Sequence, residues 1–198
     1  MRRLIVALTG ASGAIFGIRL LEVLRDTDIE THLVMSKWAV QTLEHETKLS
    51  AAEVRALASV TYDPGNMGAA ISSGSFITDG MIIAPCSMRS LGAIAHGTGH
   101  NLVHRAADVI LKERRKLVLV AREMPLSDVH LENMLKLSRI GATIMPPTPA
   151  FYNHPQSVED IVDHVVARVL DQFSIESPLA RRWDGTMRVP VARLESKA

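Results

Sequence analysis

The feature that most constrains the fold is a set of short, nearly continuous apolar runs separated by helical patterns. The runs are residues 4–8, 30–35, 80–84, 116–121 and 142–145. Strands this apolar are buried on both faces, which is typical of a parallel sheet covered by helices on each side. The clearest helix is Ser157 to Phe173, whose apolar residues form one stripe. The sequence therefore predicts an α/β protein with a doubly wound, mostly parallel sheet in three αβα layers.

Each expected strand ends in a loop of small, polar or proline residues. Right-handed crossovers place the carboxyl ends of parallel strands at one edge of the sheet, so we expect these loops to meet there. In open α/β sheets, ligands bind outside those ends. The loops are those at Gly10, Ser36, Ser87, Arg122 and Pro146. Together they form the candidate site.

The first of these loops is Thr9-Gly10-Ala11-Ser12-Gly13-Ala14, between an apolar run and a helical pattern. A strand, a small-residue turn and a helix N-terminus present backbone N–H groups and the positive end of a helix dipole to an anion. Ser12 adds a hydroxyl donor or a helix cap. The pattern G-x-x-G matches neither the dinucleotide-binding motif nor a Walker loop. Turns between a strand and a helix also favour glycine whether or not they bind a ligand. On its own, this loop could equally bind a phosphorylated ligand or make a tight connection.

Hydroxyl and charged side chains accompany the other loops. The serines beside expected helix starts are Ser12, Ser36, Ser87 and Ser90. Each could cap its own helix, the more common role, or help to surround a phosphate or the polar edge of a ring. Arg122 and Glu123 would contribute little as a surface ion pair. At the mouth of a pocket, Arg122 could bind a phosphate or a carbonyl, and Glu123 could move a proton.

The fifth loop is stiffened by prolines at 146, 147 and 149, directly before Phe151-Tyr152. A rigid loop that carries an aromatic residue fits a pocket wall, although a tyrosine here could also belong to the core. Arg168 lies at the edge of the apolar stripe of the last helix. An arginine in that position usually faces water, so sequence alone favours a solvated side chain over a ligand.

Composition excludes several classes of protein. The 198 residues carry a formal net charge of +1, which argues against a nucleic-acid binder. No window approaches the roughly 20 apolar residues of a membrane span, and the first residues lack the apolar stretch of a signal peptide. The single Cys86 suits a reducing cytoplasm. We expect one domain over residues 1–178, and an aperiodic tail over 179–198 that packs on a neighbouring subunit.

Two features of the sequence suggest a metal site or a nucleophile, but neither is supported by the residues around it. The histidines His96, His100 and His104 recur every four residues, but Gly97 and Gly99 interrupt any helix there and no carboxylate or cysteine joins them at ligand spacing. Nothing in the sequence pairs Cys86 with a histidine. We expect no metal site and no cysteine nucleophile.

Two charged or polar clusters also have simpler interpretations. Ser127, Asp128 and His130 have the residue types of a catalytic triad, but neighbours on one helical turn cannot adopt its geometry. Ser127 is better interpreted as the cap of the following helix. The charged run 112–116 is most simply a solvated helix end, where the dipole favours cations.

With these loops in view, the chain closely resembles the UbiX-like flavin prenyltransferases, and more narrowly the B subunits that accompany hydroxyarylic-acid decarboxylases. The resemblance covers nearly the whole chain, as far as Trp183. Beyond the first loop, its specific motifs are Ser72-Ser73-Gly74-Ser75-Phe76, Ile83-Ala84-Pro85-Cys86-Ser87-Met88, Arg122-Glu123-Met124-Pro125-Leu126-Ser127, His130-Leu131-Glu132-Asn133-Met134-Leu135 and Phe151-Tyr152. Several independent motifs in the right order are a stronger signal than one glycine loop.

The resemblance implies a flavodoxin-like or Rossmann-like fold assembled as a homododecamer, with FMN bound between subunits. It also implies transfer of a dimethylallyl group from dimethylallyl phosphate to N5 and C6 of reduced FMN. The product, prenylated FMN, would then serve a partner decarboxylase of the UbiD type. A monophosphate substrate requires no metal, because side-chain cations can balance its charge.

The same resemblance assigns roles to individual residues. The expected FMN contacts are Gly10, Ala11, Ser12, Ser36, Ser87, Met88, Arg89, Ser90 and Arg122. The expected contacts of the prenyl phosphate are Lys112, Glu123, Tyr152 and Arg168, with Arg89 and Arg105 nearby. Ser12 and Glu46 resemble the proton-relay pair of the family. The residues expected to act in catalysis are therefore Ser12, Glu46, Lys112, Glu123 and Tyr152.

Two other functions share this fold and stay open at this point. A flavin-dependent cysteine decarboxylase would carry Pro-Ala-Ser-Ala-Asn-Thr where this chain has Pro85-Cys86-Ser87-Met88-Arg89-Ser90, and the Met-Asn clamp of that family has no counterpart here. A non-catalytic flavin carrier subunit would need the flavin loops but neither Lys112 nor Glu123.

Overall fold

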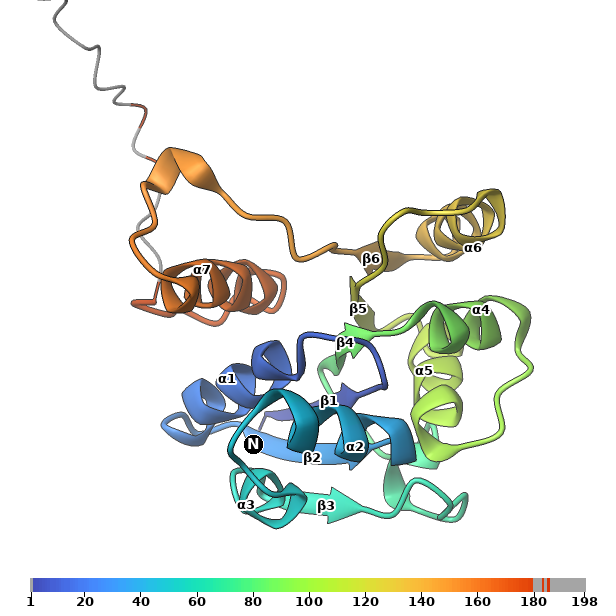
Figure 1. Ribbon diagram of the computed structural model, residues 1–198. Helices are drawn as coiled ribbons and strands as arrows, with labels where there is room; N and C mark the ends of the chain where they lie inside the picture. The colour runs from blue at the N-terminus through green and yellow to red at the C-terminus, as the bar shows by residue number, and fades with distance from the viewer. Residues whose placement is uncertain (1, 180–182, 184, 186–198) are drawn as a thin grey trace, which may run out of the picture.

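The computed structural model describes residues 2–179, 183 and 185 and contains one parallel sheet. Its strands are β1 (Arg3–Leu8), β2 (Glu30–Met35), β3 (Val60–Tyr62), β4 (Gly80–Cys86), β5 (Lys116–Ala121) and β6 (Ala142–Ile144). All strand pairs are parallel, and the order across the sheet is β3-β2-β1-β4-β5-β6 (Figure 1). This is the doubly wound order of Rossmann-like proteins, which reverses between β1 and β4. The predicted fold class is confirmed.

Helices cover both faces of the sheet. They are α1 (Ala14–Arg25), α2 (Lys37–Glu46), α3 (Ala51–Arg55), α4 (Met88–His96), α5 (Leu102–Lys112), α6 (Asp128–Arg139) and α7 (Val158–Asp171), with the short 3-10 helices η1 (Ala70–Ser72) and η2 (Phe151–Asn153). Successive residues of a strand point to opposite faces. Leu4, Val6 and Leu8 therefore pack with α1, α2, α3 and α7, whereas Ile5 and Ala7 pack with α4, α5 and α6. These two cores form the predicted three layers.

The sheet has one strand more than the sequence predicts. Residues 60–62 form β3, in a region where the sequence predicts no strand. β3 is three residues long and pairs with β2 alone, at the edge of the sheet. A strand that short cannot show a recognisable alternation, which explains why it was missed. The short helix α3 was missed as well.

The interruption expected between the histidines is confirmed. α4 ends at His96, and Gly97 follows in the left-handed conformation with a φ of 63°. The expectation of a purely solvated run over residues 112–116 is wrong in part. α5 ends at Lys112, but the Arg115 guanidinium donates to the backbone oxygens of Gly74 at 2.7 Å and Phe76 at 2.8 Å.

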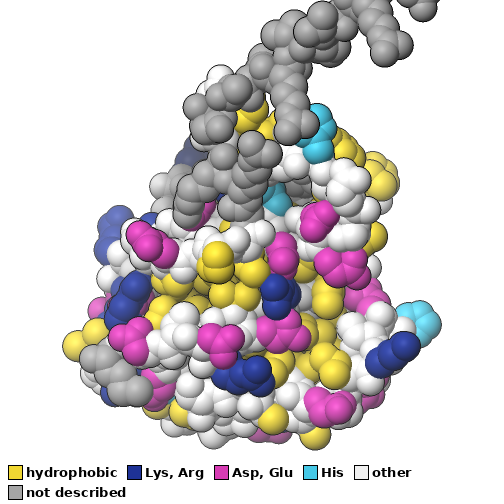
Figure 2. Space-filling model, turned by 90° about the vertical axis from the view of Figure 1, so that its left-hand side faces the viewer, with side chains coloured by type: hydrophobic (Ala, Val, Ile, Leu, Met, Phe, Trp, Pro, Cys, Tyr) yellow, Lys and Arg dark blue, Asp and Glu magenta, His cyan; other side chains and the backbone are white. Residues whose placement is uncertain are grey.

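Most of the expected tail lies outside the described residues, so the division after residue 178 stays a prediction. Leu179 is described and packs against the core beneath α1 and α7. No helix in the described part of the chain is long and apolar enough to cross a membrane. On the side that Figure 1 draws at the left, basic and acidic side chains are interspersed around apolar ones (Figure 2), in keeping with the net charge of +1.

Two glycines inside helices provide a matched test of the packing between α1 and the sheet. A Cβ on Gly17 of α1 would lie 2.3 Å from the Ala84 backbone oxygen and 2.7 Å from Leu8 Cγ, whereas a Cβ on Gly92 of α4 would meet nothing closer than 3.4 Å. We expect Gly17→Ala to lower the free energy of unfolding by about 2–3 kcal/mol, because α1 must move off the sheet. Gly92→Ala should raise it by up to about 1 kcal/mol through helix propensity. Urea unfolding measures both, and a Gly17→Ala protein as stable as the parent would contradict this packing.

Candidate functional site

The loops that follow the central strands are joined by backbone and side-chain hydrogen bonds. The buried Thr9 hydroxyl donates to the Pro85 oxygen and accepts from the Ser87 N–H, each at 2.8 Å. The Ser36 N–H donates to the Leu8 oxygen at 3.0 Å, and the Arg122 N–H donates to the Cys86 oxygen at 3.1 Å. The ends of β1, β2, β4 and β5 therefore form one continuous edge, as the sequence predicts.

Glu46, from the end of α2, binds the N-terminus of α1. Its Oε2 accepts from the N–H groups of Gly13 at 2.9 Å and Ala14 at 3.0 Å. Gly13 is the residue before the helix and adopts a φ of 105°, which favours glycine. Ser12 is thus not the helix cap; its hydroxyl instead bonds to the Glu46 carboxylate. The structure brings Ser12 and Glu46 together.

The charge of Glu46 is set by its surroundings. Partial burial disfavours the carboxylate, but hydrogen bonds from Ser12, Ala14 and Gly13 and the positive charge of Arg122 outweigh it, and the pKa of Glu46 falls below its usual value. Glu46 is therefore ionised at neutral pH. An ionised carboxylate that accepts a serine hydroxyl can take up that proton when the hydroxyl reacts.

Ser36 and Ser87 act as helix caps. The Ser36 hydroxyl accepts from the Ala39 N–H at 3.1 Å, and the Ser87 hydroxyl accepts from the Ser90 N–H at 3.3 Å. A cap uses one lone pair of the hydroxyl and leaves its hydrogen for another acceptor, which for Ser87 is the Ser90 hydroxyl. The capping interpretation is confirmed for both, and it does not prevent either serine from contacting a ligand. Met88 is partly buried and Arg89 exposed in the first turn of α4.

Gly10 permits a close contact between the first loop and α2. A Cβ at this position would lie 2.4 Å from Trp38 Cβ. Trp38 itself is 66% exposed, in the first turn of α2. A large apolar ring that stays exposed beside a ligand loop can cover an aromatic ligand or a second chain. Ala11 is buried in the same loop.

Tyr152 lies farther along the chain in η2, against α7. Its ring meets the His164 ring edge-on with centroids 6.0 Å apart, and the Trp183 ring with centroids 5.7 Å apart. Asn153 Nδ2 lies 2.9 Å from His164 Nδ1. A cavity of about 220 Å³ opens between η2 and α7 beside these residues. Burial and the positive charge of Arg168 lower the pKa of His164, and the negative charge of Asp171 opposes them only in part. The ring is therefore neutral at pH 7.

Arg168 lies near the other end of α7. Its guanidinium pairs with Asp171 at 2.6 Å. Arg2, at the start of β1, donates to the Phe173 oxygen at 2.9 Å, so the C-terminal end of α7 lies at the amino edge of the sheet. Arg168 is therefore nearer to that edge than to the loops that carry Ser12 and Arg122.

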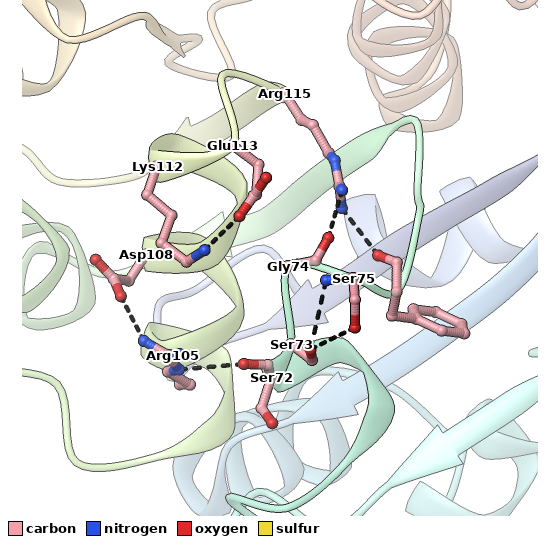
Figure 3. Close-up of polar contacts among 10 residues, drawn as sticks. Ser72, Ser73, Gly74, Ser75, Arg105, Asp108, Lys112, Glu113 and Arg115 are labelled. Carbon is pink, nitrogen blue, oxygen red and sulfur yellow. Dashed lines mark hydrogen bonds and ion pairs between the residues drawn. The ribbon is translucent and has the colours of Figure 1, made fainter.

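Lys112 and Arg105 both belong to α5, and Figure 3 shows their polar contacts. α5 ends at Lys112, shortly before β5 begins, so Lys112 is at the amino edge, where it pairs with Glu113. Arg105 bonds to Asp108 at 2.8 Å and to the Ser72 oxygen at 3.2 Å. Gly74 lies so close that an added Cβ would be 2.8 Å from Lys112 Nζ.

Within one chain, the predicted site residues therefore form two groups. At the carboxyl edge are Gly10, Ala11, Ser12, Ser36, Glu46, Ser87, Met88, Arg89, Ser90, Arg122 and Glu123. At the amino edge is Lys112, beside Gly74, whereas Arg105 lies in the first turn of α5 and bonds to the Ser72 oxygen. Tyr152 and Arg168 lie on η2 and α7. The Glu123 carboxylate is exposed and accepts from the Met124 N–H at 3.1 Å.

Three suspected chemistries find no support in the described residues. Burial raises the pKa of the Cys86 thiol to about 12, so this cysteine is not a nucleophile at neutral pH. Ser127 caps α6 by accepting from the His130 N–H at 3.3 Å, as predicted. No group of three or more metal-ligating side chains occurs in the described part of the chain.

Comparison with known proteins identifies the family. The flavoprotein family matches residues 1–170. A probable UbiX-like flavin prenyltransferase from Streptomyces sp. strain D7 is 64% identical over 184 residues, which is 92% of each chain. The chain belongs to the UbiX-like flavin prenyltransferases. It is accordingly an enzyme, a transferase, and the family resemblance predicted from sequence is confirmed.

Two solved structures of this prenyltransferase family match closely. AnUbiX (PadA1), crystallised with FMN and dimethylallyl pyrophosphate, is 53% identical with a TM-score of 0.93, covering 94% of this chain and 99% of its own. A dodecameric FMN-dependent UbiX-like decarboxylase from Escherichia coli O157:H7 is 62% identical with a TM-score of 0.91, covering 92% of this chain and 100% of its own.

Some residues near the candidate site carry little sequence signal. Trp38 could have been noticed as one of two tryptophans, placed directly after a loop that ends a strand. His164 lies one helical turn before Arg168, which is a weaker signal. The contacts of Arg115 with loop 72–76 had none, because they join residues about forty positions apart.

Replacing Glu46 tests its role at the first loop. Because the folded-state pKa of Glu46 is lowered, its charge stabilises the fold above the ordinary value of 4.5 and loses this effect as the pH falls through the folded-state value. We expect Glu46→Gln to be less stable than the parent by about 1 kcal/mol at pH 7, a modest figure because the carboxylate is largely exposed. The difference should shrink as the pH falls below 4.5 and through the lowered folded-state pKa of Glu46, as chemical denaturation at a series of pH values would measure. Glu44→Gln, on the same helix, is the control, and a pH-independent difference would contradict this role.

Proposed function

We propose that this enzyme transfers a dimethylallyl group from dimethylallyl phosphate to N5 and C6 of reduced FMN. The product, prenylated FMN, would serve as the cofactor of a UbiD-type decarboxylase of phenolic acids. The observation that carries the proposal is the meeting of serine hydroxyls, Arg122 and the Ser12–Glu46 pair at one sheet edge. The 53% identity to a protein crystallised with FMN and dimethylallyl pyrophosphate supports it.

The carboxyl edge has the donors that FMN requires. A phosphate and two ring carbonyls need N–H, hydroxyl and guanidinium donors. The residues that would hold FMN are Gly10, Ala11, Ser12, Ser36, Ser87, Met88, Arg89, Ser90 and Arg122. When bound, reduced FMN supplies the nucleophilic atoms to which the prenyl group is joined. Ser12 and Glu46 would accept the proton that is released as the new bond forms, and the charged state of Glu46 supports this role.

The leaving phosphate needs cations, and the prenyl group needs an apolar, aromatic wall. Lys112, Arg122 and Arg168 can balance the phosphate charge, each charge-assisted hydrogen bond contributing about 1.5–3 kcal/mol. Glu123 can return a proton to the departing phosphate. Tyr152 can face a developing allylic cation with its ring, and the Trp183 ring beside it adds a second π surface.

Lys112 and Arg168 reach a site at the carboxyl edge only if copies of the chain share that site. Lys112 lies at the amino edge of its own chain, opposite Arg122. The chain also exposes apolar side chains next to Glu123 and along α6, namely Met124, Val129, Leu131, Leu135 and Ile140. A second copy seated there would bury them. We therefore expect a homo-oligomer, a dodecamer as in the E. coli relative, with each site formed between subunits.

A reducing cytoplasm suits this reaction. The flavin must arrive reduced, and the chain contains a single free cysteine, Cys86. The cysteine-decarboxylase alternative has no specific support among the residues of the site. The flavin-carrier alternative remains as an outcome of the experiments.

The decisive assay is anaerobic and uses a defined flavin and donor. The protein is mixed with reduced FMN and dimethylallyl phosphate, and the extracted flavin is weighed by mass spectrometry. We expect a flavin heavier by one prenyl group, and a parallel reaction with dimethylallyl diphosphate identifies the donor. Unmodified FMN with both donors, from folded protein that binds FMN, would leave only the carrier function.

Sharing of the site between copies has its own test. Lys112→Ala and Glu123→Gln should each lower prenylation by about 10²–10³, because each removes a preorganised group at the leaving phosphate. Neither should then activate a partner decarboxylase. Co-expression of the two variants should restore activity to roughly a quarter of the sites if Lys112 and Glu123 come from different chains. Lys48→Ala, an exposed lysine elsewhere, is the control, and absence of any rescue would mean that one chain supplies both residues.

A further inference from the structure

A chain of hydrogen bonds runs from the N-terminus of α4 to His104 in α5. The Ser87 hydroxyl donates to the Ser90 hydroxyl at 3.3 Å, and Ser90 Oγ lies 3.2 Å from His104 Nε2. Ser90 is 7% exposed, so these contacts are shielded from bulk water. The function proposed above uses Ser87 and Ser90 but gives no role to His104. In the sequence, this histidine stood out only as part of a metal-like repeat.

The position of His104 is tightly constrained. It lies in the first turn of α5, where its N–H donates to the Asn101 side chain at 3.1 Å. Gly99 lies directly against it, and a Cβ on that glycine would be 2.1 Å from His104 Cβ. The ring therefore has little freedom to turn away from Ser90.

The surroundings of the imidazole indicate its protonation state. Burial, with the neighbouring His100 and the positive charge of Arg89, lowers the pKa of His104, so the ring is neutral at pH 7. Nδ1 is buried and has no hydrogen-bond partner among the described residues. A buried N–H without a partner is rarer than a buried lone pair without one. The proton of the neutral ring therefore belongs on Nε2, which then donates to Ser90 Oγ.

This tautomer determines what Ser90 can offer a ligand. A serine oxygen has two lone pairs and one hydrogen. Ser90 Oγ accepts from the Ser87 hydroxyl and from His104 Nε2, which uses both lone pairs. Its own hydrogen is left to donate. Ser90 is then a hydrogen-bond donor only, suited to an acceptor oxygen such as a flavin carbonyl or a phosphate.

We propose that His104 is a positioning residue, which leaves Ser90 able only to donate a hydrogen bond, and that Ser90 donates it to an oxygen of FMN. The inference rests on the proposed function, because it assumes that Ser90 contacts FMN. His104 itself touches no ligand. It acts by donating to one lone pair of Ser90 Oγ, so that Ser90 cannot donate its hydrogen to the ring and keeps it for the ligand.

The test compares side chains of different hydrogen-bonding capacity at position 104. His104→Leu removes the donor and should weaken FMN binding about five- to tenfold, since one oriented hydrogen bond is lost. His104→Gln retains a donor at nearly the same place and should bind within about twofold of the parent. In a Ser90→Ala background, His104→Leu should have no further effect. Flavin fluorescence titration of the apoprotein measures each dissociation constant.

Riboflavin distinguishes the two possible acceptor oxygens. If His104→Leu weakens FMN and riboflavin equally, Ser90 donates to the ring, and if it weakens FMN alone, Ser90 donates to the phosphate. His96→Leu is the matched control, because His96 bonds to Asn133 at 2.7 Å and not to Ser90. Its dissociation constant should equal that of the parent. Thermal unfolding and size-exclusion chromatography of each variant verify its fold and assembly.

Two results would overturn this role of His104. One is a folded His104→Leu protein that binds FMN as tightly as the parent does. The other is a His104→Gln protein as weak as His104→Leu, which would mean that the ring acts by its shape. A parent protein unable to bind FMN would instead contradict the proposed function itself, and this inference with it.

Discussion

The buried hydroxyl of Thr9 holds together the two strands on which the site depends. β1 and β4 are neighbours where the strand order reverses, and Thr9 bridges their ends by bonding to Pro85 and Ser87 at 2.8 Å each. Because Thr9 is only 2% exposed, the loss of either hydrogen bond would leave a buried polar group unpaired, at a cost of about 1–3 kcal/mol. The loop before α1, which carries Ser12, and the start of α4, which carries Ser87 and Ser90, are therefore held at a fixed separation. A rigid pair of loops can hold donors in place before a ligand arrives, which is what electrostatic stabilisation of a reacting group requires.

The parts of the fold that follow from local pattern could be predicted from sequence. The apolar runs determined the central strands, and their carboxyl ends determined which loops meet. The capping roles of Ser36, Ser87 and Ser127 also follow from their place before helices. What could not be predicted depends on pairs far apart in the chain. Glu46 accepts from the N–H groups of Gly13 and Ala14, which are 33 and 32 positions earlier in the chain. No local pattern predicts this contact, and only the family resemblance paired Glu46 with this loop.

His104 illustrates the same limit from the other direction. Its repeat with His96 and His100 attracts attention as a metal motif, yet the glycines between them place the three on separate segments. Its relevant neighbour is Ser90, fourteen positions earlier on a different helix. The regular spacing of the histidines suggests a metal site and gives no sign of the hydrogen bond between His104 and Ser90, because the break between the helices changes which residues face each other. Arg115 is similar: in sequence it is one cation of a charged run, and in space it holds the backbone of Gly74 and Phe76.

The separation of Lys112 and Arg168 from Arg122 follows from the topology. In a doubly wound parallel sheet, each crossover helix runs antiparallel to the strands, so its C-terminal end lies at the amino edge. Lys112 ends α5 and Arg168 lies in the last turn of α7, so both cations are carried away from the ligand edge of their own chain. Helix C-termini favour cations electrostatically, and carboxyl edges favour ligands geometrically. The phosphate site that we propose uses both features and would therefore be assembled from more than one copy, with the exposed apolar side chains of α6 as a surface on which copies can join.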